Sequence, residues 1–121
     1  MYQISVRQHF DAAHYLRGYG GKCENMHGHR FEVAVTVEAG GLSDIGIVYD
    51  FSELKHDLGD IIQQFDHACL NDVPPFDSIN PSSENIARTI CDALAGRLRE
   101  VVISRVEVWE SPESKATYIP S

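Results

Sequence analysis

The chain has 121 residues, a length that suits one domain spanning residues 1–121 and leaves no room for a second. Hydrophobic residues make up 43% and charged residues 23% of the sequence, which is typical of a soluble globular fold and excludes a disordered tail. The formal net charge of −8 argues against a nucleic-acid partner, because phosphate binding needs clustered basic side chains.

No apolar run approaches the roughly 20 residues that span a bilayer. The first residues lack the charged and apolar regions of a signal peptide, and the three cysteines show no paired spacing. We therefore expect a cytoplasmic protein with no membrane partner and no disulfide framework.

Alternating hydrophobicity predicts two strands at the start of the chain, over residues 4–14 and 31–37, each with one buried face. The connection between them is rich in glycine, and residues 45–51 form another short β-prone stretch. Apolar residues at helical spacing then predict helices over 54–65, capped by Asp50 or Ser52, and over 86–98, capped by Ser82 and Ser83. Further strands are expected over 101–110 and 116–119.

This order of elements predicts an α+β fold in which the helices pack on one face of a mostly antiparallel sheet. Two helices cannot cover both faces of such a sheet. The other face is therefore expected to be polar or covered by a partner subunit.

Three of the six histidines are placed to meet at one end of the sheet. His27 and His29 flank Gly28 at the entry to the second strand, so both project from the same face, and His14 ends the first strand on its apolar face. If the two strands pair as a hairpin, the three imidazoles converge. Three neutral imidazoles suit Zn²⁺ and leave an open position for water or substrate, whereas isolated histidines are usually structural.

Cys23, four residues before His27, has two interpretations. It completes a closed structural zinc site, or it is a thiolate that acts as a base beside the metal. Cys69 and Cys91 lie within or beside the predicted helices and are expected to be small buried apolar residues.

Charged residues at two other places in the sequence are candidates for a functional site. Asp66 precedes His67, and a carboxylate beside an imidazole can fix its tautomer, although solvated charges at a helix end are the simpler interpretation. Glu110 continues the inward phase of Val106 and Val108, so a carboxylate is predicted where an apolar residue is expected. A ligand with paired N–H donors is one natural partner for it.

Several motifs occur together in order along the chain: Phe10-Asp11-Ala12-Ala13-His14, Cys23-x-x-x-His27-Gly28-His29, Asp50-Phe51, Leu70-Asn71-Asp72, Pro81-Ser82-Ser83-Glu84-Asn85 and Trp109-Glu110. With them the chain resembles the 6-pyruvoyltetrahydropterin synthase family, most closely its 6-carboxy-tetrahydropterin synthase branch (QueD), from Phe10 to Tyr118. The resemblance implies a tunnelling fold, in which a four-stranded antiparallel sheet with two helices on one face assembles into an oligomeric barrel. Such proteins are commonly homohexamers, built as two trimers with sites at subunit interfaces.

The resemblance also implies a function. The substrate would be 7,8-dihydroneopterin triphosphate, the metal zinc, and the products 6-carboxy-tetrahydropterin, acetaldehyde and triphosphate, in queuosine or related deazapurine synthesis. The matched residues would take these roles: zinc ligands His14, His27 and His29; proton-abstracting residue Cys23; relay pair Asp66 and His67, from a neighbouring subunit; pterin anchor Glu110; and pocket-lining hydroxyls Ser82 and Ser83.

Alternatives stay open at this point. Glu24 directly follows Cys23, and some relatives use a glutamate in this loop for a folate-type cleavage that gives 6-hydroxymethyl-dihydropterin. Formation of 6-pyruvoyltetrahydropterin is disfavoured by the short spacing from Cys23 to His27, and a non-catalytic zinc-stabilised subunit is the alternative from another class. Candidates for binding the triphosphate, each equally well explained as a solvated charge, are Lys22, Arg30 and Lys115.

Overall fold

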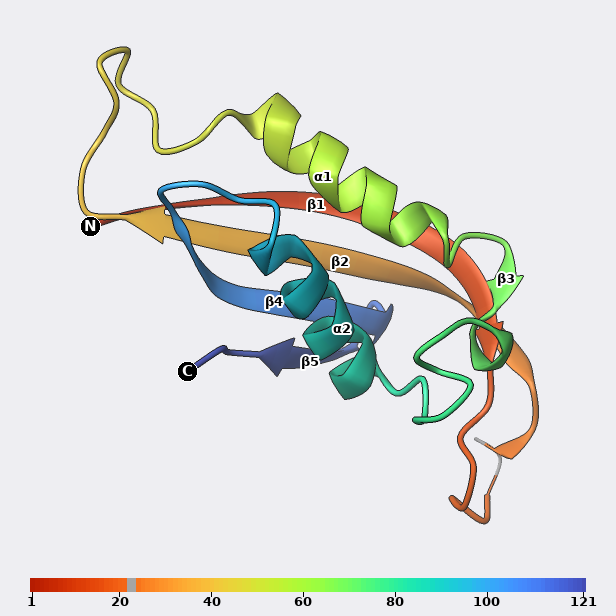
Figure 1. Cartoon of the computed structure of the whole chain (residues 1–121). Helices are drawn as coiled ribbons and strands as arrows, with labels where there is room; N and C mark the ends of the chain where they lie inside the picture. Colours follow the sequence, from red (N-terminus) through yellow and green to blue (C-terminus); the bar gives the residue numbers. More distant parts are fainter. Residues whose placement is uncertain (22–23) are drawn as a thin grey trace.

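The computed structural model describes residues 1–21 and 24–121. Two helices cover one face of a five-stranded sheet with strand order β3-β1-β2-β4-β5 (Figure 1). The elements are β1 (Tyr2–His14), β2 (His27–Ala39), α1 (Phe51–Gln63), β3 (Ala68–Cys69), the 3-10 helix η2 (Leu70–Asp72), α2 (Ser83–Ala95), β4 (Val102–Ser111) and β5 (Ser114–Tyr118). The predicted α+β fold is confirmed, and within one chain the sheet is not closed. None of the described helices has the length and apolar character needed to cross a membrane.

Two local predictions differ from the structure. The sheet has a fifth strand, β3, which pairs in parallel with β1 and was missed because it is only two residues long. The stretch 45–51 is not a strand, since Gly46 has a φ of +83° and its N–H donates to Ser43 O at 2.9 Å, which closes a turn. Turn geometry here overrides the β propensity of the neighbouring branched residues.

Side-chain caps begin both helices. Asp50 accepts a hydrogen bond from the backbone N–H of Ser52 at 2.7 Å, and Ser82 accepts one from that of Asn85 at 3.1 Å. Each bond satisfies a backbone donor that the first turn leaves free. Of the candidate caps, Asp50 and Ser82 therefore fill the N-cap positions, whereas Ser52 and Ser83 lie in the first turns.

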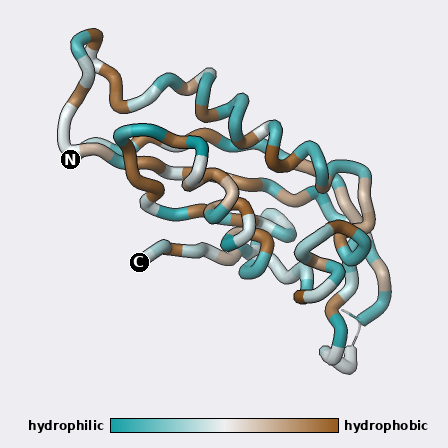
Figure 2. Tube along the Cα trace, viewed as in Figure 1, coloured by the Kyte–Doolittle hydropathy of each residue, from teal (hydrophilic) through white to brown (hydrophobic). Residues whose placement is uncertain are grey.

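The longest pairing in the sheet joins β1 and β2 along their full 13 residues, from Tyr2 opposite Ala39 to His14 opposite His27. Hydrophobic and hydrophilic stretches are interspersed along the whole trace (Figure 2). One face of the two strands supplies the apolar core, as expected. The expectation of a single buried face is wrong for β2, however, because Ala34 and Thr36 on its other face are buried as well. α1 packs over β1, and α2 packs over β4 and β5 (Figure 1). The core between these layers includes a stack of Phe10 on Phe31, with ring centroids 5.1 Å apart.

The opposite face of the sheet carries charged pairs. Arg7 Nε lies 3.0 Å from Glu32 Oε2. Glu107, whose side chain is only 11% exposed, is paired with Arg105 at 3.3 Å and with Lys115. Burial acts to raise the pKa of the Glu107 carboxyl, but hydrogen bonds and charge from Lys115 and Arg105 outweigh it and hold the pKa below its ordinary value.

This pairing predicts a pH-dependent contribution to stability. A carboxyl with a lower pKa in the folded than in the unfolded chain stabilises the fold above the unfolded-state pKa, and that stabilisation is lost as the pH falls through the folded-state pKa. Glu107→Gln should lower the free energy of unfolding at neutral pH by about 1–2 kcal/mol. The difference from wild type should shrink below about pH 4. Urea denaturation across pH measures it, with exposed Glu113→Gln as the control, and a difference independent of pH would contradict the prediction.

Candidate metal centre and active site

The pairing of β1 with β2 brings His14, His27 and His29 together at one end of the sheet. His14 lies directly opposite His27, and His29 lies opposite Ala12 on the same face. The ring centroids are 4.6 Å apart for His14 and His27, 4.7 Å for His27 and His29, and 5.3 Å for His14 and His29. The convergence expected from a hairpin is therefore present in the structure.

Hydrogen bonds to backbone carbonyls orient two of the three rings. His14 Nδ1 lies 2.7 Å from Pro81 O, and His27 Nδ1 lies 2.6 Å from Asn25 O. A carbonyl oxygen can only accept, so each Nδ1 carries the proton and each Nε2 presents a lone pair. Carbonyl partners of this kind are usual behind metal-bound histidines.

The Nε2 atoms have the environment that a metal ion requires. Among the described residues, the Nε2 atoms of His14 and His29 are buried and make no hydrogen bond. Burial, reinforced by the two neighbouring imidazoles and opposed by Glu110, lowers the pKa of His29 and so favours its neutral, metal-binding form. The donor set fits a metal ion of the kind that imidazole ligands favour.

Glu110 joins this group. Its Oε1 lies 2.9 Å from His29 Nε2, 3.6 Å from His14 Nε2 and 3.9 Å from His27 Nε2. The ligand atoms of all four residues lie within 4.8 Å of one another. The carboxylate points to the core face, as its phase predicts, but its side chain is 35% exposed and thus half-buried rather than buried.

A small cavity of about 170 Å³ adjoins Glu110, between the start of α2 and β5. Ser83 lines it, and the Ser83 hydroxyl is buried with no hydrogen-bond partner among the described residues. Ser82 differs, because its hydroxyl is engaged in capping α2. Of the two serines, Ser83 is therefore the one whose hydroxyl is free to meet a ligand beside Glu110.

Asp66 and His67 form a separate pair. Asp66 Oδ2 lies 3.1 Å from His67 Nδ1, and Asp66 Oδ1 accepts the backbone N–H of Asp11 at 3.0 Å. The bond from Asp11, with a smaller contribution from His67, lowers the pKa of Asp66 and keeps it ionised. The His67 ring is 80% exposed and belongs to a different cluster from the three histidines, so one chain does not bring the pair to them.

The structure describes only part of the loop before β2, and it pairs two of the three candidate phosphate ligands with carboxylates. Cys23 and Lys22 lie outside the described residues. The Glu24 carboxylate accepts the backbone N–H of Gly18 at 3.0 Å. Arg30 pairs with Asp11 at 3.3 Å and Lys115 pairs with Glu107, so both cations are already neutralised by carboxylates.

The structure reveals a supporting network that sequence reasoning missed. The side-chain amide of Asn71 both donates to and accepts from the backbone of Tyr15, at 3.0 Å each way, and Asn80 does the same for Arg17, at 2.9 and 3.0 Å. The Arg17 guanidinium donates to Phe76 O at 2.8 Å and to Ile79 O at 3.3 Å. Residues 71–81, which also supply the carbonyl behind His14, thus hold the chain just after β1. The sequence motifs include Asn71 and Pro81, but nothing in the sequence indicated the partners of these residues.

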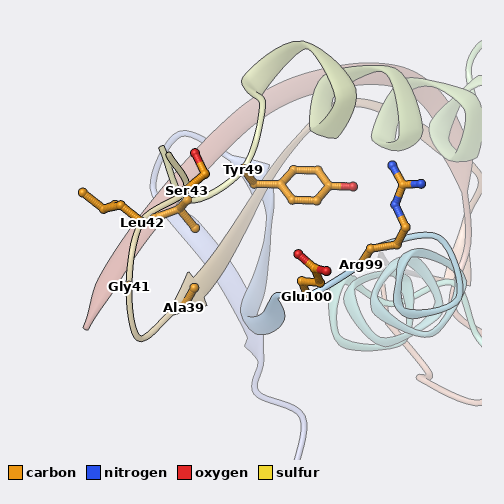
Figure 3. Close-up of a pocket in the computed structure, with 8 residues that line it drawn as sticks. Ala39, Gly41, Leu42, Ser43, Tyr49, Arg99 and Glu100 are labelled. Carbon is orange, nitrogen blue, oxygen red and sulfur yellow. The ribbon is translucent and has the colours of Figure 1, made fainter. Parts of the chain in front are cut away.

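A larger cavity of about 510 Å³ lies at the other end of the sheet, beyond Ala39 of β2. Figure 3 shows the Tyr49 hydroxyl directed toward the Arg99 guanidinium, with Glu100 nearby. None of the candidate site residues that the structure describes lines this cavity, so it is distinct from the histidine group.

Fold and site together define an α+β protein with a histidine-rich group able to bind a metal ion. The family profile described as 6-pyruvoyl tetrahydropterin synthase matches residues 3–121. The 6-carboxy-5,6,7,8-tetrahydropterin synthase of Haemophilus influenzae is 32% identical over 145 aligned positions, covering 98% of this chain and 99% of that protein. The dihydroneopterin monophosphate aldolase of Pyrococcus furiosus is 35% identical over 112 positions, covering 92% and 91%.

Among solved structures, the 6-pyruvoyl tetrahydropterin synthase of Caenorhabditis elegans superposes with a TM-score of 0.91 at 28% identity, covering 99% of this chain and 96% of that one. The chain therefore belongs to the 6-pyruvoyl tetrahydropterin synthase family, a family of lyase-type pterin enzymes. The family resemblance drawn from the sequence motifs is confirmed.

The supporting network yields a prediction about metal affinity. Arg17→Ala removes donors to three backbone carbonyls, those of Asn71, Phe76 and Ile79. It should loosen the segment that orients His14 and weaken metal binding by roughly 10- to 100-fold, the usual cost of losing a supporting contact around a metal site. Titration with Zn²⁺ measures the affinity. Arg88→Ala, which removes an exposed arginine from α2, should leave it unchanged, and equal affinities for the two variants would contradict a supporting role for Arg17.

Proposed function

We propose that the protein is a zinc-dependent lyase that converts 7,8-dihydroneopterin triphosphate and one water molecule to 6-carboxy-5,6,7,8-tetrahydropterin, with release of acetaldehyde and triphosphate. The observation that carries the proposal is the convergence of three imidazoles. In His14 and His27, the Nδ1–H donates to a backbone carbonyl, so Nε2 presents its lone pair to a metal. The Haemophilus influenzae relative, which bears the name of this synthase and aligns along almost the whole chain, supports the choice of reaction.

In this proposal His14, His27 and His29 hold zinc through Nε2. Zinc supplies Lewis acidity, which stabilises the negative charge that develops on the substrate side chain as a C–H proton leaves. The protein's own contribution is to orient the rings of His14 and His27 through their carbonyl partners and to favour the neutral form of His29 by burying it.

Cys23 is the proposed base that takes the proton, and Asp66 and His67 complete the relay. Asp66, held as a carboxylate, fixes the proton on His67 Nδ1 and leaves its Nε2 free to exchange a proton. Because His67 points to solvent, away from its own histidine group, we assign the pair to the site of a neighbouring copy. A homohexamer built as a dimer of trimers is the proposed assembly.

The substrate's ring is proposed to bind beside Glu110. A carboxylate can accept two N–H donors from the amino-pyrimidine edge of a pterin, and the free hydroxyl of Ser83 lines the adjoining cavity. Ser82 contributes mainly by capping α2 and so placing Ser83. The chain is proposed to act as one cytoplasmic domain, in the biosynthesis of queuosine or a related deazapurine.

A folate-type cleavage to 6-hydroxymethyl-dihydropterin is the second candidate function. The Pyrococcus furiosus aldolase is as similar to this chain as the carboxy-synthases are, and Glu24 follows Cys23. The hydrogen bond from Gly18 to the Glu24 carboxylate favours a structural role for Glu24 and places this activity second.

Product analysis tests the choice between the two reactions. Zinc-loaded protein incubated with dihydroneopterin triphosphate should release a 6-carboxy pterin, identified by mass and chromatography, and a chelator should abolish its formation. A 6-hydroxymethyl product would instead support the folate-type cleavage. Absence of turnover with zinc bound would overturn both.

Two variants distinguish an enzyme from a zinc-stabilised structural subunit. His27→Ala removes a proposed ligand and should lose both zinc and turnover, whereas Cys23→Ala should retain zinc while losing turnover by at least about 100-fold, the lower end of what a general base contributes. Metal content per chain and product formation are the measurements. If Cys23→Ala loses its zinc, the cysteine is a fourth ligand and the site is a closed structural one.

A further inference from the structure

The role of a pterin anchor does not by itself explain where the Glu110 carboxylate lies. As the anchor for a pterin ring, its carboxylate should face the cavity that it shares with Ser83. Its Oε1 instead lies among the three imidazole Nε2 atoms, nearest to that of His29. A carboxylate oxygen in this place competes for the position that a three-histidine site leaves open.

The distances match a fourth ligand. Four atoms that each lie about 2.0–2.1 Å from a zinc ion at the corners of a tetrahedron are about 3.3 Å from one another. Glu110 Oε1 is 2.9, 3.6 and 3.9 Å from the Nε2 atoms of His29, His14 and His27. The contact between Glu110 Oε1 and His29 Nε2 is short but is not a hydrogen bond, as expected for two atoms that share a cation.

The surroundings also allow the carboxylate to move. Glu110 lies where the pairing of β4 with β5 shifts register between Trp109 and Ser111, and such irregularities re-aim side chains. Its side chain is 35% exposed and makes no hydrogen bond with the described residues. The cavity beside it gives the carboxylate a second place to lie, next to the unpartnered hydroxyl of Ser83.

We propose that Glu110 alternates between two positions. Without a pterin, its carboxylate occupies the fourth metal position and excludes other ligands. When a pterin binds, the same carboxylate turns into the cavity to accept the N–H donors of the ring, and the fourth position opens for the substrate's side chain.

The exchange makes access to the metal conditional on correct ring binding. A small molecule without the amino-pyrimidine edge does not displace Glu110 and therefore does not reach the metal. That Glu110 is a fourth metal ligand depends only on the group of His14, His27, His29 and Glu110. That a pterin displaces Glu110 rests on the proposed function.

Cobalt substitution tests the metal half without any turnover. Co²⁺ has visible d–d bands that change with its ligands, and azide is a small anion that binds an open position. Azide should leave the Co²⁺ spectrum of the wild type unchanged and should shift that of Glu110→Gln, whose Co²⁺ dissociation constant should rise at least about tenfold. Glu84→Gln, which removes a charge from the same cavity outside the metal group, should behave as wild type. An equal azide response in wild type and Glu110→Gln would overturn the assignment of Glu110 as a ligand.

Pterin itself, which has the ring but no side chain, tests the second half. Added to the wild-type Co²⁺ protein, it should change the d–d bands and make them responsive to azide. Binding of pterin without a change in the bands, or failure of pterin to bind, would overturn the exchange. Glu110→Asp, whose carboxylate is one methylene shorter, should be azide-responsive from the start and serves as a second variant if Glu110→Gln does not fold.

These outcomes are separable from failure of the proposed function. An azide-resistant wild type with an azide-responsive Glu110→Gln establishes the fourth ligand even if dihydroneopterin triphosphate is not turned over. Turnover of that substrate together with an azide-responsive wild type supports the reaction and rejects the exchange.

Discussion

The site depends on one constraint, the register in which β1 pairs with β2. Along 13 residues this pairing sets His14 opposite His27 and puts His29 on the same face two positions further along β2. A slip of one residue would turn one strand's histidines to the other face, since side chains alternate along a strand. The same register buries Phe10 against Phe31, so the apolar core and the metal group specify the same alignment.

The segment between the two helices also stabilises the region around the three histidines. Its two asparagines each pair with both backbone groups of a residue beyond β1, much as another strand would, and its Pro81 carbonyl fixes the tautomer of His14. The loop thus satisfies backbone groups that would otherwise lack partners, and it does so at the point where the chain leaves the sheet. The metal group is consequently supported from two sides, by the sheet and by a loop that contributes no ligand.

In the proposed function, one chain supplies the three histidines but not the whole catalytic arrangement. Asp66 and His67 form a well-defined pair that faces solvent, and the sheet face away from the helices carries charged pairs. An open sheet with exposed functional groups is compatible with a site completed by another copy. The Glu110 carboxylate lies 2.9 Å from His29 Nε2, and in the proposed exchange it occupies the position that a substrate atom would later take.

The sequence by itself determined the α+β fold, the two long strands, both helices and the convergence of the three histidines, because the periods of two and 3.6 assign each side chain to a face. Tertiary structure alone decided the rest. The two-residue strand β3 and the turn at Gly46 are too short for periodicity to detect, and the partners of Asn71 and Asn80 lie more than 50 residues away. The place of Glu110 among the imidazoles was likewise hidden, since phase predicts the face on which a side chain lies but not which neighbour from another strand it meets.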